Sequence, residues 1–357
     1  MKIGIVTQPL SDNYGGVLQN YALQTTLKKL GHEPTTLNVV PKTMHEKIWF
    51  RHTVKYILKQ CILNKKEEYY RLYYNKDKRI AQFVDKYIIH TPVHRDYTGF
   101  DVKRMGFDAI VLGSDQVWRK EYNYGVWKDK FLRFVGEENV LRLAYAASWG
   151  SDRCEFNSKD LSIARPLIWK FKAVSVREKS GIDLCKKNFG IEAIEVLDPT
   201  LLLSKDDYAE LTKQVKREET PYLAAYVLDS SSQKKQLINQ IAKSKGLRVI
   251  DFGLAKNNIG VEEWLSLFAN ADFVVTDSFH GTVFSIINHR PFASVVNAQR
   301  GATRFYSLLS KFGLENRIVE TMDQAGQLNN IDWINVEKQL TSWQEISLNF
   351  LQSNLIK

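Results

Sequence analysis

The segment that most constrains the fold is A-D-F-V-V-T-D-S-F-H-G, residues 271–281, which continues as T-V-F-S-I-I. Phe273, Val274 and Val275 predict a short buried strand, and the apolar residues at 283, 284, 286 and 287 predict a helix beyond a polar turn. A buried strand followed at once by a helix is the repeating unit of parallel α/β sheets. Such sheets bind ligands at the carboxyl edge of their strands. We therefore expect this turn to face a ligand.

Strand and helix patterns alternate along most of the chain. Strands are predicted at residues 2–7, 34–39, 107–112, 143–147, 173–176, 193–197, 222–228, 248–252, 273–276 and 292–296. Helices are predicted at residues 16–30, 159–171, 179–189, 231–245, 260–269, 282–289, 302–312 and 332–353. This alternation predicts an α/β protein with two doubly wound, Rossmann-like domains that face a cleft.

The chain of 357 residues is long enough for two domains. A polar, charged stretch at 205–220 ends at Pro221, just before a new strand, so we expect the boundary there. The prediction is an N-terminal domain at 1–205 with a basic helical excursion at about 42–90. A C-terminal domain follows at 206–331, and a helix at 332–357 packs back over the body.

Much of the net charge of +10 lies in the excursion, where residues 42–90 hold twelve Lys or Arg against five Asp or Glu. Apolar residues recur there at helical spacing, from Phe50 to Ile62. A helix that lies on an anionic membrane surface is one interpretation, but we favour a helix that packs on the body with solvated lysines. Because no recognised nucleic-acid motif accompanies the charge, no nucleic-acid partner is expected.

The sequence also bears on location. It contains no run of about 18 apolar residues, and M-K-I-G-I-V-T predicts a strand rather than a signal peptide. Cys61, Cys154 and Cys185 form no C-x-x-C pair, which indicates a reducing compartment without a disulfide framework or zinc cluster. We expect a cytoplasmic protein, at the inner membrane face if the basic helix binds lipid. The oligomeric state is left open.

His280 is the titratable group of the turn at 276–281, where it follows Asp277 and Ser278. The start of a helix presents unpaired N–H groups and a partial positive charge, which favour an anion. An imidazole beside such an anion can act as a general acid. The alternative is a histidine of the core or of the helix cap. We favour the functional interpretation because of its polar neighbours.

Three arginines fall at predicted carboxyl ends of strands. Arg300 and Arg304 follow the strand at 292–296, and together they favour an anionic ligand. Arg177 follows the strand at 173–176. It is either a clamp for phosphate or carboxylate or, as spacing alone slightly favours, an ion-pair partner of Glu178.

Two turns of the N-terminal half carry further ligand-type groups. The first strand is followed by D-N-Y-G-G, whose glycines allow a ligand to approach a helix N-terminus closely. This segment matches neither the dinucleotide fingerprint nor the Walker pattern. The strand at 107–112 is followed by G-S-D-Q-V-W, whose carboxylate, carboxamide and indole suit sugar hydroxyls and a sugar ring face. In both turns a plain helix cap is the alternative.

Taken together, these motifs resemble the polysaccharide pyruvyl transferase family. The resemblance rests on N-Y-G-G-V-L-Q-N-Y-A-L from Asn13, G-S-D-Q-V-W from Gly113, S-V-R-E from Ser175, L-D-P-T from Leu197, D-S-F-H-G from Asp277 and R-x-x-x-L-L from Arg304. It implies a fold similar to GT-B glycosyltransferases. It also implies that phosphoenolpyruvate forms a ketal with two hydroxyls of a sugar in a cell-surface polysaccharide or its precursor, without a metal or organic cofactor.

The resemblance also implies roles for single residues. His280 is the expected acid, and we assign Asp115 as the base. The expected donor-binding residues are Arg177, Arg304, Arg300, Ser278 and Gly281. The expected acceptor-binding residues are Asn13, Tyr14, Gly15, Gly16, Gln116 and Trp118. The acceptor is thus assigned to the N-terminal domain and the donor to the C-terminal domain.

The chain departs from the family at two positions. Many members carry Arg where this chain has Ser278, and Gly-Asp where it has Gly15-Gly16. We expect Arg304, together with Arg300, to supply the missing donor charge. Two other functions stay open: a GT-B glycosyltransferase that uses a nucleotide sugar, and a non-catalytic glycan-binding component of a polysaccharide assembly complex. The acceptor sugar and its linkage to lipid are also open.

Overall fold

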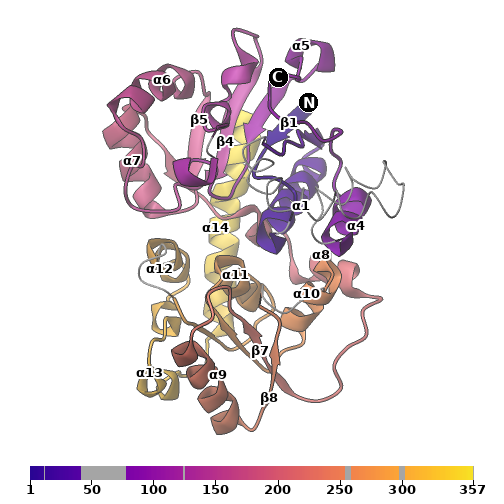
Figure 1. Cartoon of the computed structure of the whole chain (residues 1–357), viewed down its shortest axis with the longest axis vertical. Helices are drawn as coiled ribbons and strands as arrows, with labels where there is room; N and C mark the ends of the chain where they lie inside the picture. Colours follow the sequence, from indigo (N-terminus) through magenta and orange to yellow (C-terminus); the bar gives the residue numbers. More distant parts are fainter. Residues whose placement is uncertain (12, 42–77, 124, 254–258, 297–301, 357) are drawn as a thin grey trace, which may run out of the picture. The chain divides into compact units, whose positions relative to one another are not determined.

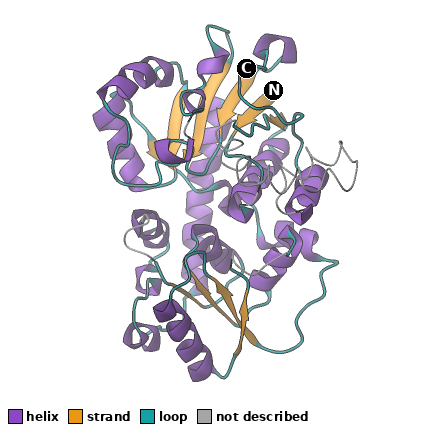
Figure 2. Ribbon diagram, in the orientation of Figure 1, coloured by secondary structure: helices purple, strands orange, loops and turns teal. Residues whose placement is uncertain are grey.

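The computed structural model describes residues 1–11, 13–41, 78–123, 125–253, 259–296 and 302–356. They form two compact units: unit 1 comprises Met1–Pro199 and Asn349–Lys357, and unit 2 comprises Thr200–Leu348. Figure 2 shows strands and helices in both. Of the predicted basic excursion, α4 (Lys78–Tyr87) and the residues that follow it are described. The segment 47–63, for which membrane binding was the alternative to packing on the body, lies outside the described residues.

Unit 1 contains a parallel sheet of six strands in the order β2-β1-β3-β4-β5-β6. The strands are β1 (Lys2–Val6), β2 (Glu33–Thr36), β3 (Ala109–Leu112), β4 (Leu141–Ala147), β5 (Ala173–Val176) and β6 (Ile194–Glu195). The helices are α1 (Tyr14–Lys29), α4, α5 (Val102–Met105), α6 (Ser158–Ile168) and α7 (Lys179–Phe189), with short 3₁₀ turns at Lys120–Asn123, Asp129–Phe131 and Arg133–Val135. In Figure 1, α6 and α7 lie beside β5, whereas α1 lies near β1 and α4 lies next to α1.

The central strands of unit 1 are apolar because helices cover the sheet. All four residues of β3 are buried, which is typical of parallel strands. One large aromatic cluster packs beyond the strand ends, where the Trp118 ring contacts the rings of Phe131 and Trp149. α1 begins at a cap: the Asn13 side chain accepts a hydrogen bond from Gly16 N, 3.2 Å away.

Unit 2 contains a parallel sheet of four strands in the order β10-β9-β7-β8. The strands are β7 (Tyr222–Tyr226), β8 (Arg248–Asp251), β9 (Phe273–Thr276) and β10 (Phe292–Ser294). The helices are α8 (Lys205–Thr212), α9 (Ser232–Lys245), α10 (Val261–Ala269), α11 (Phe279–Ile287), α12 (Ala302–Ser310), α13 (Met322–Gly326) and α14 (Trp333–Asn354), with 3₁₀ turns at Pro199–Leu202 and Glu315–Arg317. The predicted α/β class with Rossmann-like sheets is therefore confirmed.

The division of the chain differs from the predicted one in two respects. Unit 2 begins at Thr200, before the charged stretch that was expected to form the boundary. It also includes α14 as far as Leu348, while the last residues of that helix belong to unit 1. The polar stretch at 205–220 therefore begins with a helix, α8, and is not the linker between the units.

Both sheets place a topological switch point at their carboxyl edge. In unit 1 the chain moves from β1 to β2 on one side and continues with β3 on the other, so the switch point lies between β1 and β3. In unit 2 it lies between β7 and β9 by the same logic. Ligands of open α/β sheets bind outside the carboxyl ends of the strands at such points. The turns after these four strands are therefore the places to examine.

Candidate functional site

Asp115 follows β3 at the switch point of unit 1 and adopts an unusual backbone conformation. Its φ of 75° lies in the left-handed region, which costs energy in a residue other than glycine. The turn is fixed because Ser148 N and Val117 N both donate to the Asp115 carbonyl, at 3.0 and 2.7 Å. The carboxylate oxygen Oδ1 accepts a hydrogen bond from Gln116 N at 2.8 Å. The strained turn therefore holds the carboxylate at the sheet edge.

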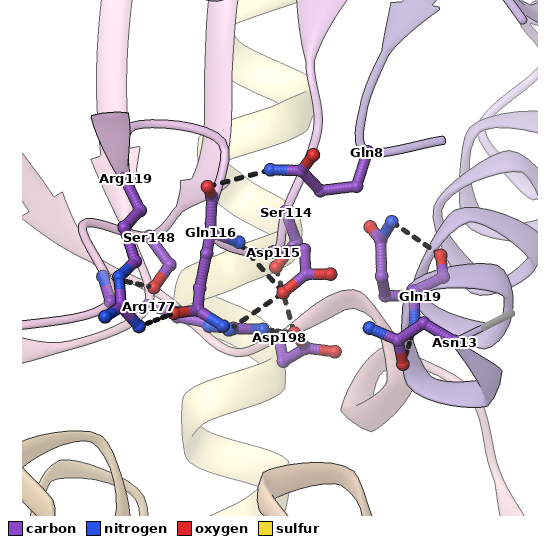
Figure 3. Close-up of polar contacts among 12 residues, drawn as sticks. Gln8, Asn13, Gln19, Ser114, Asp115, Gln116, Arg119, Ser148, Arg177 and Asp198 are labelled. Carbon is purple, nitrogen blue, oxygen red and sulfur yellow. Dashed lines mark hydrogen bonds and ion pairs between the residues drawn. The ribbon is translucent and has the colours of Figure 1, made fainter. Parts of the chain in front are cut away.

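Arg177 lies at the centre of three carboxylates at the same edge. Its guanidinium nitrogens lie 2.8 Å from Asp198 Oδ2, 3.4 Å from Asp115 Oδ1 and 3.8 Å from Glu178 Oε2. The Arg177 side chain is 1% exposed. Burial alone would lower its pKa, but the three carboxylates outweigh burial and raise the pKa of Arg177. Figure 3 shows Arg177 between Asp115 and Asp198.

Hydroxyl and backbone groups hold the carboxylates of this cluster in place. Ser114 Oγ donates to Asp198 Oδ2 at 2.9 Å. Glu178 Oε1 accepts hydrogen bonds from Ser148 Oγ at 2.9 Å and from Trp149 N at 2.7 Å. Glu178 thus ties the loop after β4 to the start of α7. The cluster joins the ends of β3, β4 and β5 into one rigid edge.

Gln116 was predicted to bind the acceptor, but its side chain already accepts a hydrogen bond within the protein. Gln116 Oε1 accepts from Arg119 Nη1 at 3.1 Å, and the Gln116 carbonyl accepts from Gln8 Nε2 at 2.8 Å (Figure 3). A Cβ added to Gly150, whose φ is 73°, would lie 2.4 Å from Gln116 Oε1. Gly150 therefore makes room for this side chain.

Trp118 was predicted to stack on a sugar ring, but the structure places it in the core. Its ring is 1% exposed and stacks on Phe131, with 5.7 Å between ring centroids. Its other contacts are Trp149, at 5.0 Å, and the Lys130 carbonyl, to which Trp118 Nε1 donates. Because neighbouring aromatic rings cover the indole, the predicted stacking role does not fit this geometry.

Lys130 is a buried cation that sequence reasoning missed. Its Nζ donates to the carbonyl of Thr7, just beyond β1, and to Tyr97 Oη at 3.0 Å. Burial lowers the pKa of Lys130 to about 7, against the opposing attraction of Asp129 and Asp115. A lysine that titrates near neutral pH at a ligand edge is a candidate for a functional group. The signal in the sequence is weak, since D-K-F-L carries no motif.

Asp277 connects the two strand ends at the switch point of unit 2. Its carboxylate accepts hydrogen bonds from Leu228 N at 2.6 Å and Asp229 N at 3.1 Å. It also pairs with Lys234 Nζ of α9 at 2.6 Å. A cavity of about 530 Å³ opens beside this pair, between the start of α9 and the residues after β10. Its lining includes Asp229, Ser231, Lys234, Val295 and Thr321.

His280 is the second residue of α11, and Ser278 is the cap of that helix. Ser278 Oγ accepts from Gly281 N at 3.3 Å. The His280 side chain is buried, and its ring lies edge-on to Phe279, with 5.3 Å between centroids. A Cβ added to Gly281 would lie 2.3 Å from Thr276 Oγ1, so only glycine fits there. His280 therefore stands at a capped helix N-terminus, as predicted from the sequence.

Arg304 lies in the first turn of α12 and is half-buried. Arg300, its predicted partner in binding the donor, lies outside the described residues. Asn13, Tyr14, Gly15 and Gly16 form the cap and first turn of α1, beside the carboxylate cluster of unit 1. Asp115, Arg177 and the start of α1 are thus brought together in unit 1, whereas His280, Ser278 and Gly281 form a separate turn in unit 2.

The profile of the polysaccharide pyruvyl transferase family matches residues 13–299 of the chain. The chain belongs to this family. The match includes every motif on which the resemblance rested except the one that begins at Arg304. No curated protein sequence is significantly similar to this polysaccharide pyruvyl transferase family member.

Solved structures resemble this family member only distantly. A Streptomyces glycosyltransferase is 12% identical, with a TM-score of 0.45 and 99% of each chain covered. A UDP-GlcNAc 2-epimerase of Methanocaldococcus jannaschii is 12% identical, with a TM-score of 0.49, and 99% of this chain and 100% of that chain are covered. A UDP-GlcNAc 2-epimerase of Neisseria meningitidis is 9% identical, with a TM-score of 0.47, and the coverage is 100% and 95%.

The described residues also bear on two requirements, those of a metal site and of a membrane-spanning helix. Within the described ranges, no three or more His, Cys, Asp or Glu side chains are grouped so as to hold a metal ion. No helix in the part of the chain that the structure describes is long and apolar enough to cross a membrane.

Sequence reasoning missed the role of Asp198 in this pyruvyl transferase family member. Asp198 belongs to the L-D-P-T motif, which follows β6 at the same edge as Arg177. Its position after a strand was the available signal. Glu178 was considered as a local partner of Arg177, and that ion pair is present together with the two longer-range ones. The prediction that Arg177 binds the donor would require a carboxylate partner to be exchanged for a donor group.

Proposed function

We propose that this chain transfers a pyruvyl group from phosphoenolpyruvate to two hydroxyls of a sugar in a cell-surface polysaccharide or its precursor. The methylene carbon of the donor takes a proton, and the bond between the enol carbon and the phosphate oxygen breaks. Two new bonds join that carbon to the two hydroxyl oxygens, forming a ketal. The hydroxyls lose two protons: one balances the proton on the new methyl group, and the other leaves with phosphate.

The observation that carries this proposal is the family match, and the carboxylate edge of unit 1 supports it. Asp115 lies at the switch point, where its carboxylate oxygens can accept hydrogen bonds from sugar hydroxyls, and Asp198 holds Ser114 and Arg177 beside it. In the proposal, Asp115 takes the proton of an attacking hydroxyl. The ion pair with Arg177 keeps the Asp115 carboxylate oriented for this step.

His280 is the proposed acid. It lies in the first turn of α11, and a helix N-terminus favours the phosphate or carboxylate of the donor. A protonated imidazole can deliver the proton that the methylene carbon takes. Ser278 and Gly281 help to hold this turn, through the cap and through close packing against Thr276.

The trianionic donor also needs cations. We propose that Arg304 contributes a guanidinium to the donor, with Arg300 as its neighbour in sequence. Arg177 joins them when a donor carboxylate or phosphate replaces one of its present partners. Replacing Arg304 with Ala should weaken phosphoenolpyruvate binding by about tenfold or more, because a charge-assisted hydrogen bond is worth roughly 1.5–3 kcal/mol. Calorimetry with the exposed Arg165→Ala variant as control measures the change, and an unaltered affinity contradicts the assignment.

The function is tested by phosphate release from phosphoenolpyruvate in the presence of a panel of methyl hexopyranosides. We expect phosphate release that depends on the added sugar, together with a ketal product that is heavier than the glycoside by C₃H₂O₂. His280→Gln should reduce the rate by about 10²–10⁴, the usual share of a general acid. Thermal stabilisation by UDP or GDP sugars, without stabilisation by phosphoenolpyruvate, would instead favour a nucleotide-sugar glycosyltransferase.

A further inference from the structure

Three buried amide side chains of α1 differ in how their polar atoms are satisfied. Asn20 exchanges hydrogen bonds with Thr36 Oγ1 through both ends of its amide, at 2.9 and 3.1 Å. Gln24 Nε2 donates to Thr36 Oγ1 and to the Ile89 carbonyl, both at 2.7 Å, and Gln24 Oε1 accepts from Ile89 N at 3.0 Å. Gln19 is equally buried, but its oxygen Oε1 has no hydrogen-bond partner among the described residues.

The orientation of the Gln19 amide follows from its neighbours. Gln19 Nε2 donates to Thr7 Oγ1 at 2.7 Å and to the Gly16 carbonyl at 2.8 Å. A carbonyl oxygen can only accept, so the nitrogen must face Gly16 and the oxygen must face elsewhere. A buried acceptor without a donor is costly. Unlike the oxygens of Asn20 and Gln24, Gln19 Oε1 therefore still lacks a donor among the described residues.

Gly16 lies beside both the Gln19 amide and the candidate site. The Cβ that a larger residue would carry at Gly16 would lie 3.4 Å from Asp115 Oδ2, so the carboxylate approaches the first turn of α1 closely. Asp115 Oδ1 faces away, toward Gln116 N and Arg177. In Figure 3 the Asp115 side chain extends from the turn after β3 toward α1, where Asn13 and Gln19 lie.

We propose that Gln19 Oε1 and Asp115 Oδ2 form a pair of acceptors that binds two neighbouring hydroxyls of an uncharged sugar. Each hydroxyl donates one hydrogen bond to this pair. A carboxylate has no proton to donate at neutral pH, and any anion, phosphate included, is repelled by the Asp115 carboxylate, so an anion does not fit here. The inference rests on the proposed function and assigns its acceptor sugar to the start of α1 in unit 1. Gln19 acts as a specificity-determining residue.

The test compares two matched substitutions on one helix. Gln19→Met and Gln24→Met each remove one buried amide of the same size from α1. We measure binding of methyl glucoside, galactoside and mannoside by saturation-transfer NMR, and unfolding by circular dichroism. Gln19→Met should weaken binding of the preferred glycoside by about tenfold, the equivalent of one well-formed hydrogen bond. Gln24→Met should leave that affinity within twofold and lower the melting temperature more than Gln19→Met does.

Three results would overturn the inference. The wild-type protein could fail to bind any glycoside, or the two variants could lose affinity equally. The affinity could also be unchanged in Gln19→Met, as expected if an internal water satisfies Gln19 Oε1. The proposed function fails separately, when the wild-type protein binds a glycoside but releases no phosphate from phosphoenolpyruvate. If phosphate is released, the Gln19→Met effect should appear in the KM for the sugar, with the KM for phosphoenolpyruvate unchanged.

Discussion

At the scale of single residues, unit 1 holds two buried basic side chains at one sheet edge, and their pKa values shift in opposite directions. Arg177 is matched by three carboxylates, which raise its pKa despite complete burial. The hydrogen-bond acceptors of Lys130 Nζ are uncharged, the Thr7 carbonyl and the Tyr97 hydroxyl, and burial lowers its pKa to about 7. Arg177 therefore stays charged at every working pH, whereas Lys130 exchanges a proton near neutrality.

Lys130 makes the stability of the protein depend on pH. Between pH 7 and about 10.4 the unfolded chain keeps the lysine proton while the folded chain has released it, so the free energy of unfolding rises with pH. Between pH 7 and 10, the free energy of unfolding of the wild-type protein should therefore rise by about 4 kcal/mol relative to that of Lys130→Met. Urea unfolding of both proteins at several pH values measures the difference. The exposed Lys103→Met variant is the control, and a difference that does not change with pH would contradict the assignment.

At the scale of elements, α11 shows what the chain gains from Ser278. The apolar pattern predicted a helix from residue 282, but α11 begins at Phe279 because the Ser278 hydroxyl caps it. Arginine, which the family resemblance led us to expect here, is not a favoured capping residue. This chain thus has a capped helix where a cation was expected.

Exchanging the cap should separate stability from donor binding. Ser278→Ala should lower the free energy of unfolding by about 1 kcal/mol, the usual value of a lost N-cap, while Ser278→Thr should retain most of it. Ser278→Arg should also lose the cap but bind phosphoenolpyruvate more tightly than Ser278→Ala does. Chemical denaturation and calorimetry measure the two quantities. Equal stability of the Ala and Thr variants would show that the cap contributes little.

The turn between β9 and α11 also depends on Gly281. An added Cβ would lie 2.3 Å from Thr276 Oγ1, which already donates to the Tyr226 carbonyl and accepts from Ser278 N. Gly281→Ala should therefore lower the free energy of unfolding by about 1–3 kcal/mol through overpacking. Gly326→Ala is the control, because an added Cβ there meets no atom within 4 Å. Similar unfolding curves for the two variants would refute the predicted clash.

At the scale of the whole molecule, α14 links the two units through one continuous helix. Its residues up to Leu348 belong to unit 2, and Asn349–Lys357 belong to unit 1. In unit 1, Phe350 and Leu351 are buried, and the Phe350 ring contacts Tyr145 with 6.3 Å between centroids. Lys172 Nζ further donates to the Asn354 carbonyl at 3.0 Å. The C-terminal helix was predicted to pack back over the body, and its end completes the core of unit 1.

Removing the Phe350 side chain should therefore weaken unit 1, although the residue lies near the C-terminus. Phe350→Ala should lower the free energy of unfolding by about 3–5 kcal/mol, the usual cost of a buried phenylalanine. Ile346→Ala, on the same helix and 43% exposed, should have a much smaller effect. Thermal unfolding followed by tryptophan fluorescence compares the variants. A small effect of Phe350→Ala would mean that the end of α14 frays from unit 1.

The sequence by itself predicted most of the elements, because buried parallel strands and amphipathic helices have distinct periods. It predicted β5, β9 and α7 with the bounds that the structure has. Other strands are shorter than predicted, since apolar residues beyond a strand end can bury themselves without pairing. Val227 and Val295, for example, were expected in strands and are buried, but they follow β7 and β10.

The site could be predicted only in part. Residues that follow strands, such as Asp115, Arg177 and His280, are visible in the sequence because parallel strands end at a common edge. The partners of a side chain are not visible, because they depend on strand order. Asp198 meets Arg177, and Gly16 comes close to Asp115, only because the sheet of unit 1 brings distant segments to one edge. Trp118 was misjudged for the same reason: an indole after a strand suits a ligand or a core equally well.

The sequence thus determined the α/β class, the family and the turns that carry polar groups, since each depends on residues near one another in the chain. Tertiary structure alone decided which charges are compensated, which amide oxygen lacks a donor and where the last helix belongs. Electrostatic energies and hydrogen bonds fall off over a few ångströms of space rather than along the sequence. Arg177, Lys130 and Gln19 acquire their properties from neighbours that the fold supplies.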